Sequence, residues 1–100
     1  MKNAILIDDK DSVVTIVDGA GKGETVSFFR GETKETLTAA DEIPPCHKMA
    51  IRDIPKGERV IKYGEIIGEA MEDIPVGGWV SHLNIQSLPR NYEEELSREV

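Results

Sequence analysis

The fold of this chain is decided by residues 44–84, which read PPCHKMAIRDIPKGERVIKYGEIIGEAMEDIPVGGWVSHLN. Five of these residues are glycines and four are prolines, so the stretch consists of short extended pieces joined by tight turns. Within it, DIPKGERV (residues 53–60) recurs twenty residues later as DIPVGGWV (residues 73–80). In each copy we expect isoleucine in the core, proline at the first central turn position, glycine at the turn exit and valine at the start of a strand. Two units are too few for a solenoid, so they predict two similar turns in a small pseudo-symmetric β-domain.

Short apolar and β-branched runs predict the strands of the first half. They cover residues 4–7, 12–17, 25–30 and 33–38. The acidic residues 8–11 predict a hairpin turn between the first two strands, and Gly31 turns the third into the fourth. The first 43 residues therefore predict a small antiparallel meander, which the prolines at 44 and 45 end, with no group placed for catalysis.

The second half predicts further short strands, at residues 48–51, 60–61 and 65–67. Residues 69–73 fit either one helical turn or an extended approach to the second repeat unit. In a last strand, alternation would place Val80, His82 and Asn84 on one face. The sequence thus predicts an all-β domain over residues 1–88, with one or two short helical turns, and a charged tail over 89–100 where Asn91 could cap a short helix.

Composition excludes several classes of protein. One hundred residues, of which 39% are hydrophobic and 31% charged, suit one globular domain. No apolar run approaches the roughly 20 residues that a membrane span needs, so we expect neither a membrane segment nor a signal peptide, and a cytoplasmic location. A single cysteine cannot form an internal disulfide, which agrees with a reducing compartment.

The net charge of −7 argues against nucleic acid as a partner, because the twelve basic residues are scattered among nineteen acidic ones. One local group of cations is the candidate for binding an anionic sugar acid. It consists of Lys48, Arg52, Lys56, Arg59 and Lys62. The loop DGAGKG at residues 18–23 suggests a phosphate loop, but it lacks the Gly-Lys-Ser/Thr ending and no long helix follows, which favours a plain connection.

Three places carry side chains suited to chemistry. His47 and Lys48 follow a rigid break, where histidine could act as a general acid or base or be an ordinary surface residue. His82 and Asn84 fit a site or a solvated face. The triplet at residues 62–64 combines a cation, a phenol and a flexible backbone, and it also fits a plain strand end and turn.

A metal site made by this chain alone is not expected. Zinc or iron needs three or more ligands, whereas Cys46, His47 and His82 have no paired spacing. Cys46 also has no assignable base that would make it a nucleophile. Trp79 suits a core or interface anchor.

The pattern HKxAxxDIxxGxxVIKYGxxIGxAxxDIxxGxxV at residues 47–80 resembles the N-terminal domain of the altronate dehydratase family. This family also includes galactarate dehydratase and sulfolactate sulfo-lyase. The resemblance implies a SAF domain of β-clip fold, as in sialic acid synthases and type III antifreeze proteins. The His-Lys and Val-Ile-Lys-Tyr-Gly blocks are its most distinctive parts.

The resemblance also implies a lyase that removes water, or in one branch sulfite, from a small acidic sugar or hydroxy acid. Relatives of the dehydratase type depend on a divalent metal, commonly iron, which a large catalytic part would mainly hold. In some relatives that part is fused to the SAF domain, and in others it is a separate subunit. This chain resembles the separate small subunit, so we expect a large dehydratase subunit as partner, and a possible homo-oligomer in isolation.

By the same resemblance, His47 and Lys48 would be catalytic. The expected substrate-binding residues are Lys62, Tyr63, His82 and Asn84. Lys48 or Lys62 would neutralise the substrate carboxylate and His47 would relay a proton. This requires the loop into Lys48 and the bend at Tyr63 to surround one opening that a larger protein completes.

The chain departs from the family where the domain commonly ends in Val-His-x-His-Asn. Here residues 80–84 read VSHLN, so both expected histidines are replaced and His82 stands between their positions. Cys46 also replaces a small residue, often glycine. These changes leave open a divergent subunit, one that has lost chemistry, a non-catalytic module that binds carbohydrate or protein, the small subunit of a sulfo-lyase, or a fragment of a fused enzyme.

Overall fold

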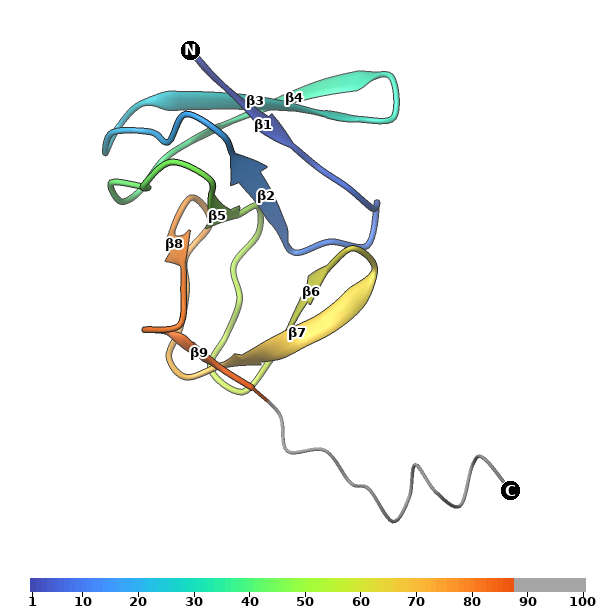
Figure 1. The fold of residues 1–100 in the computed structure, drawn as a ribbon, viewed down its shortest axis with the longest axis vertical. Helices are drawn as coiled ribbons and strands as arrows, with labels where there is room; N and C mark the ends of the chain where they lie inside the picture. The colour runs from blue at the N-terminus through green and yellow to red at the C-terminus, as the bar shows by residue number, and fades with distance from the viewer. Residues whose placement is uncertain (88–100) are drawn as a thin grey trace.

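Nine strands and no helix make up residues 1–87, the part of the chain that the computed structural model describes (Figure 1). The strands are β1 Lys2–Ile5, β2 Val13–Ile16, β3 Thr25–Arg30, β4 Thr33–Thr38, β5 His47–Ala50, β6 Arg59–Lys62, β7 Glu65–Ala70, β8 Trp79–Val80 and β9 Ile85–Gln86. The mainly β prediction is confirmed. The expected short helical turns are absent from residues 1–87, and 69–73 continue β7 into a bend. The helix expected near Asn91 lies outside the described residues.

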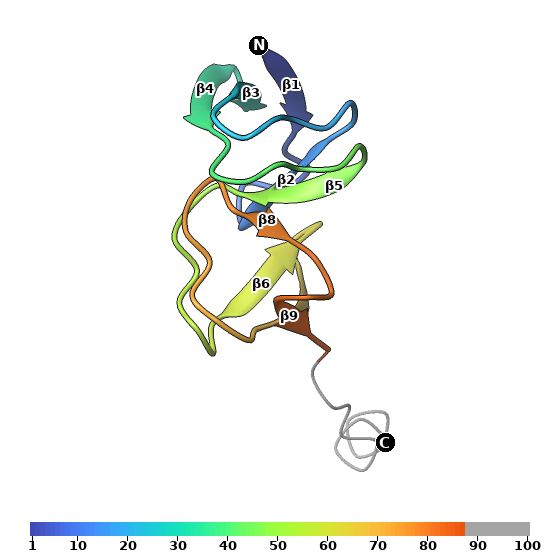
Figure 2. The ribbon, with the colours of Figure 1, turned by 90° about the vertical axis from the view of Figure 1, so that its left-hand side faces the viewer.

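The strands form two sheets. One has six strands in the order β4-β3-β1-β2-β5-β8, and the other has three in the order β6-β7-β9. The β3–β4 hairpin lies at one end of the domain and β6, β7 and β9 lie at the other, with β2, β5 and β8 between them (Figures 1 and 2).

β2 is central because both of its faces are buried. Val14 and Ile16 contribute to one core, while Val13 contributes to a second. The first core also contains Ala20, Val26, Phe28, Ala39, Ile43 and Met49. The second core contains Ala50, Ile54, Val60, Ala70, Ile74 and Val80. The sheet of β2, β5 and β8 therefore separates two hydrophobic cores.

The predicted antiparallel meander is wrong in its order. β1 and β2 form the expected antiparallel pair, with Ala4 opposite Ile16, but β1 also pairs in parallel with β3, with Lys2 opposite Val26. β1 thus lies between β2 and β3. The physical reason is that β5 pairs with the second edge of β2, so β3 can pair only with the free edge of β1. The glycine-rich connection then carries the chain past β1 to the far edge of that strand.

Four backbone amides of that connection, those of Gly19, Ala20, Gly21 and Gly23, already donate to acceptors of the chain. The Gly21 N–H donates to the Glu24 carboxylate at 2.9 Å, so a carboxylate of the chain already occupies the place where a phosphate would have to bind. Gly19 has a φ of 73°, and a Cβ there would lie 2.6 Å from the Ile43 carbonyl oxygen. The loop is a packed strand connection, as the sequence favoured.

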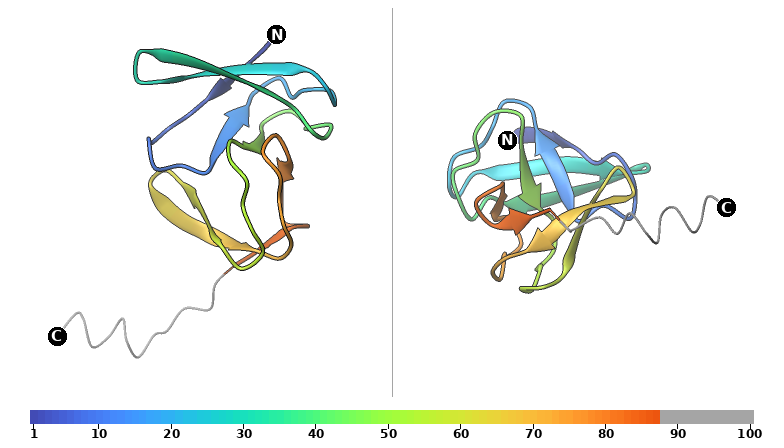
Figure 3. Two further views of the ribbon diagram at one scale, coloured as in Figure 1. Left: turned by 180° about the vertical axis from the view of Figure 1, so that it is seen from behind. Right: turned by 60° about the horizontal axis from the view of Figure 1, so that its bottom comes forward.

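The two repeat units lie side by side in antiparallel orientation. Ile54 and Ile74 exchange both backbone hydrogen bonds at 2.8 Å, and their side chains are 0% and 3% exposed. The two segments run side by side between the two sheets (Figure 3). The pseudo-symmetric arrangement and the burial of both isoleucines confirm the prediction from the repeat.

The turn within each repeat differs from the expected one by one position. Glu58 N–H donates to the Pro55 carbonyl at 3.0 Å, so proline is the first residue of the turn and not its first central residue. Gly57 is the second central residue, with φ of 88°, and Gly77 repeats this with φ of 85°. The shift arises because the first central residue of each turn donates its N–H to an aspartate of the other repeat. Proline has no N–H, so it cannot occupy that position and stands one place earlier.

Candidate functional site

A hollow of about 430 Å³ lies between the start of β5, the β6–β7 turn and the segment that contains β9. Its lining residues are Lys48, Lys62, Tyr63, Ile67, His82, Ile85, Gln86 and Ser87. We call it the lysine hollow. It brings together four of the six residues that the sequence selected, and it places Lys48 and Tyr63 at one opening as the prediction required.

Lys48 and Lys62 carry the positive charge of the lysine hollow. Lys48 is half-buried, and its pKa is lowered from 10.5 by burial first and then by the positive charge of Lys62. Within residues 1–87, neither ammonium has a carboxylate oxygen within 4.0 Å, because the only ion pairs there join Arg30 to Glu35 and Arg52 to Glu58. The negative charge of an anion bound between the two lysines would compensate for the lost hydration of Lys48 and offset its repulsion by Lys62.

The larger basic cluster that the sequence suggested is divided in the structure. Arg52 pairs with Glu58 at 2.7 Å and donates to the Ser12 hydroxyl at 3.3 Å. Only Lys48 and Lys62 of the five cations line the lysine hollow. The positive charge at the lysine hollow therefore comes from two lysines, while Arg52 serves the packing of the β-domain.

The Tyr63–Gly64 turn delivers two side chains to the lysine hollow. Lys62 pairs with Glu65 across this turn, and both central residues have positive φ, 59° at Tyr63 and 71° at Gly64. This is the backbone of a type I′ hairpin turn, which matches the twist of the strands. The Lys62 ammonium lies 4.9 Å from the centroid of the Tyr63 ring, which is 59% exposed. The turn thus holds a cation and a phenol side by side at the opening.

His47 lies on the other face of β5 from Lys48, because consecutive residues of a strand point to opposite sides. The Trp79 indole N–H donates to His47 Nδ1 at 3.1 Å, and the two rings meet edge to face with centroids 5.5 Å apart. Since the indole can only donate, Nδ1 must be the unprotonated nitrogen of a neutral imidazole, with the proton on Nε2. The structure does not bring His47 into the lysine hollow.

The last predicted strand is wrong, because a turn at residues 81–84 separates β8 from β9. The turn forms because Asn84 Oδ1 accepts from the Ser81 N–H at 2.9 Å, while Asn84 Nδ2 donates to the Trp79 carbonyl. His82, inside the turn, lines the lysine hollow, whereas Asn84 does not. Both ends of the Asn84 amide are engaged in holding the turn.

Sequence reasoning missed the contribution of β9 to the site. Ile85 and Gln86 line the lysine hollow because β9 pairs with β7. One signal was present in the sequence: Gly68 interrupts β7, and a Cβ there would lie 2.7 Å from the Gln86 carbonyl oxygen. A glycine inside a strand indicates that another backbone approaches closely.

The donor set of residues 1–87 does not fit a bound metal. No group of three or more histidine, cysteine or acidic side chains comes together in residues 1–87. His47 Nδ1 accepts from Trp79, the Cys46 thiol donates to the Val17 carbonyl at 3.6 Å, and His82 faces two lysines. These donors lie at three different places, so they cannot together hold one metal ion.

No helix of residues 1–87 is long and apolar enough to cross a membrane.

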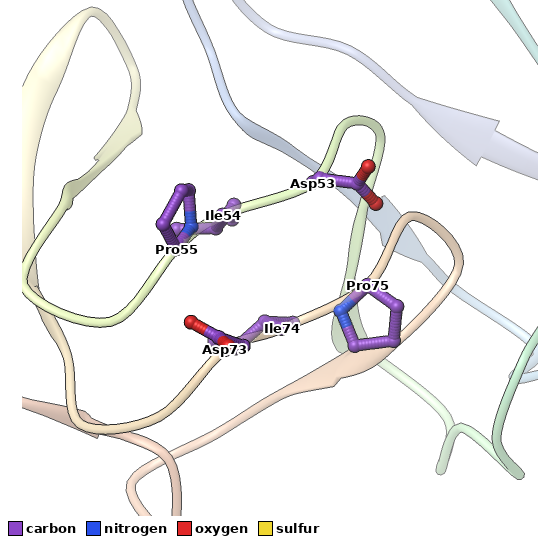
Figure 4. Close-up of a pocket in the computed structure, with 6 residues that line it drawn as sticks. All are labelled: Asp53, Ile54, Pro55, Asp73, Ile74 and Pro75. Atoms are coloured by element: carbon purple, nitrogen blue, oxygen red, sulfur yellow. The ribbon is translucent and has the colours of Figure 1, made fainter.

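A second hollow, of about 360 Å³, lies where the two repeat segments run side by side (Figure 4). It is lined by Asp53, Ile54, Pro55, Asp73, Ile74 and Pro75. Its carboxylates are committed to the backbone: Asp53 accepts from the Val76 N–H at 2.9 Å and Asp73 accepts from the Lys56 N–H at 2.8 Å. These two aspartates therefore stabilise the pairing of the two repeats.

The chain is similar to domains and subunits of several lyases. It is 38% identical to galactarate dehydratase (L-threo-forming) of Escherichia coli over 76 residues, 76% of this chain and 14% of that protein. It is 28% identical to altronate dehydratase of Bacillus subtilis over 94% of this chain and 18% of the relative. It is 34% identical to (2R)-sulfolactate sulfo-lyase subunit alpha of Chromohalobacter salexigens over 83% of this chain and 92% of that subunit.

The chain spans less than a fifth of the two dehydratases but nearly the whole of the sulfo-lyase subunit. The family model of the altronate/galactarate dehydratase SAF domain matches residues 2–88, which include all nine strands. The chain therefore belongs to the altronate/galactarate dehydratase SAF domain family, a family of lyases.

Proposed function

We propose that this chain is the small subunit of a sugar-acid or hydroxy-acid lyase, whose substrate pocket it completes beside a separate large catalytic subunit. The observation that carries the proposal is the lysine hollow, in which Lys48 and Lys62 face an opening without a carboxylate partner among residues 1–87. A small substrate with a carboxylate supplies the missing negative charge. The preferred reaction is elimination of water, as the names of the dehydratase relatives suggest.

The share of each relative that this chain covers supports the subunit role. A relative named as subunit alpha is covered over 92% of its length, whereas the dehydratases extend far beyond the region that resembles this chain. None of the residues of 1–87 that line the lysine hollow is acidic, so the described part of the chain offers no carboxylate base there. A large partner would supply the rest of the catalytic groups, including the divalent metal, for which iron is the expected ion.

In this proposal the two lysines act on the substrate carboxylate. Loss of the proton beside a carboxylate places additional negative charge on its oxygens, and a fixed cation stabilises that charge more than the ground state. Lys48 suits the task because burial has already removed part of its water shell, which strengthens its attraction to an anion. The Tyr63 hydroxyl and the His82 ring, on the same opening, would bind substrate hydroxyl groups.

His47 and Asn84 lie outside the lysine hollow, so in this proposal neither residue contacts the substrate carboxylate there. His47 is committed to Trp79 through Nδ1, so its Nε2–H is the group that remains for a partner subunit or for proton relay. Asn84 would act by holding the turn that presents His82. Both roles are separable from anion binding, because neither residue lines the lysine hollow.

Co-expression with a large dehydratase subunit tests the proposal. We expect the reconstituted complex to dehydrate galactarate or altronate, the small chain alone to have no activity, and Lys48→Ala and Lys62→Ala to lose turnover without loss of assembly. The matched control is Lys56→Ala, which removes an exposed lysine outside the hollow. Turnover by the small chain alone, or full turnover in both lysine variants, would overturn the proposal.

A second candidate is the small subunit of a sulfolactate sulfo-lyase, in which sulfite leaves instead of water. The near-complete coverage of subunit alpha from Chromohalobacter salexigens favours it, as does 43% identity over 51 residues to the subunit of the same name from Paracoccus pantotrophus. Two cations in one hollow also suit a substrate with a carboxylate and a sulfonate. Release of sulfite from sulfolactate by the complex would select this branch. Assembly without turnover on any of these acids would favour a non-catalytic binding module.

A further inference from the structure

We infer that Asp11 is a positioning residue of the lysine hollow: it holds the Tyr63–Gly64 turn so that Lys62 and Tyr63 face the anion. The inference rests on the proposed function, because it assigns Asp11 a part in binding the same substrate. Asp11 does not line the hollow itself and acts through the backbone of the turn.

Asp11 is a buried carboxylate that serves only backbone amides. Asp11 is 4% exposed, and no lysine, arginine or histidine of residues 1–87 forms an ion pair with its carboxylate. Oδ1 accepts from the Gly64 N–H at 2.8 Å and Oδ2 accepts from the Asp8 N–H at 3.1 Å. A charge that has lost its water depends on such bonds, so the contact with Gly64, 53 positions away in sequence, is a strong link between the two halves of the domain.

The turn that Asp11 holds requires such support. Tyr63 has a φ of 59°, a left-handed conformation that costs a residue with a side chain about 1 kcal/mol or more. A carboxylate that binds the next amide stabilises this turn relative to other conformations of residues 62–65. Without the bond from Asp11, tyrosine at the first central position of the turn would favour another turn type, because this type prefers Gly, Asn or Asp there. The Tyr63 side chain would then point in a different direction.

Ser12 provides a second attachment on the other side of Lys62. The Ser12 N–H donates to the Ile61 carbonyl at 2.9 Å, and the Ser12 hydroxyl accepts from the Ile61 N–H at 3.2 Å. Asp11 and Ser12 thus hold the hairpin at Ile61 and Gly64, one position before Lys62 and one position after Tyr63. The two residues that enter the hollow lie between two fixed points.

The test compares Asp11→Asn with Asp9→Asn in the full chain. Asp11→Asn keeps the size of the side chain but replaces one of two acceptors by a donor. Asp9→Asn makes the same change of charge two residues away, on an exposed side chain that forms no hydrogen bond with the described residues. The probe is galactarate, titrated while the backbone amide resonances are followed by NMR.

We expect Asp11→Asn to shift the amide resonances of residues 62–64, to leave those of the loop at residues 18–24 in place, and to raise the dissociation constant of galactarate about tenfold. Asp9→Asn should change neither. Galactarate affinity equal to wild type in a folded Asp11→Asn chain would overturn the inference. If Asp11→Asn does not fold, Ser12→Ala takes its place, with weaker binding expected and unchanged binding contradicting the role.

A measurement on the wild-type chain separates this inference from the proposed function. The hydrogen bond predicts a through-bond NMR coupling between the Gly64 nitrogen and the Asp11 carboxylate carbon. Its absence would overturn the positioning role whatever galactarate does. Presence of the coupling without galactarate binding would leave the contact supported and would instead contradict the proposed anion site.

Discussion

Asp53 and Asp73 exchange equivalent hydrogen bonds: each carboxylate accepts the backbone N–H of the third residue after the other aspartate, at 2.9 and 2.8 Å. The same relation holds for the glycines of the two repeats. Gly57 N–H donates to the Ala70 carbonyl at 2.9 Å, and Gly77 N–H donates to the Ala50 carbonyl at 2.8 Å. The repeat in the sequence is therefore a two-fold repeat of hydrogen bonds, in which each unit completes the turn of the other.

This reciprocity predicts equal losses of stability when either aspartate is removed. Asp53→Ala and Asp73→Ala each leave one turn amide without its acceptor, so each should lower the free energy of unfolding by about 1–2 kcal/mol. Urea unfolding measures the loss, with Asp9→Ala as the control on an exposed carboxylate. A large effect at one aspartate and none at the other would show that the two bonds are not equivalent in solution.

A second prediction concerns the charge on Lys48. Its pKa is lowered in the folded chain by burial and by Lys62, so between that value and 10.5 the unfolded chain binds more protons than the folded one. The free energy of unfolding therefore rises with pH through this window, and below it the charged ammonium is a constant cost to the folded state. Lys48→Gln should raise stability at pH 7, and the gain should shrink as the pH approaches about 10.

Urea unfolding at both pH values checks this, with Lys56→Gln as the control at an exposed lysine. A gain for Lys48→Gln that stays the same at high pH would mean that packing, and not charge, is responsible. Loss of stability at neutral pH would contradict the prediction directly.

Local patterns in the sequence were enough to find most strands. The β-branched run at residues 25–30 coincides with β3 and the alternating run at 33–38 coincides with β4. The turn at Gly31 marks where β3 ends and where β4 can begin. The repeat predicted the buried pair Ile54 and Ile74. These features depend on neighbouring residues, which a sequence displays directly.

The strand order and half of the site depend on distant contacts and could not be obtained in that way. Nothing near β1 shows that its second neighbour is β3, since that choice follows from the pairing of β2 with β5, which is distant in sequence. Asn84 appeared free for a substrate, because its bonds to Ser81 and Trp79 form only when the turn closes. His47 and Lys48 are adjacent in sequence, yet the strand sends them to opposite faces.

A third prediction follows from the bond between Trp79 and His47. Because the indole N–H donates to Nδ1, the neutral His47 ring should carry its proton on Nε2. Long-range proton–nitrogen NMR of the imidazole distinguishes the two tautomers. Trp79→Phe removes the donor and should let both tautomers appear, while His82 in the same sample reports a ring without this partner. A proton on Nδ1 of His47 in the wild-type chain would exclude the bond.

The fourth prediction uses the two turn glycines as a matched pair, because they occupy the same repeat position with φ of 88° at Gly57 and 85° at Gly77. A Cβ at Gly57 would meet no atom within 4 Å, whereas at Gly77 it would collide with the Thr38 carbonyl oxygen and lie 3.0 Å from the Ala40 nitrogen. Gly57→Ala should therefore cost only the backbone strain, about 1 kcal/mol. Gly77→Ala should cost at least about 2 kcal/mol more, because backbone atoms must move.

Thermal and urea unfolding of the two variants give the difference, in which the strain common to both cancels. The excess at Gly77 would measure how tightly the second repeat packs on the segment after β4, where the Ala40 N–H also donates to the Gly77 carbonyl at 2.9 Å. That contact joins the repeat to the N-terminal half, just as the bond from Asp11 to Gly64 does on the side of the lysine hollow. Equal costs at Gly57 and Gly77 would mean that this junction yields readily, and the two halves would then have to be linked mainly through Asp11 and β2.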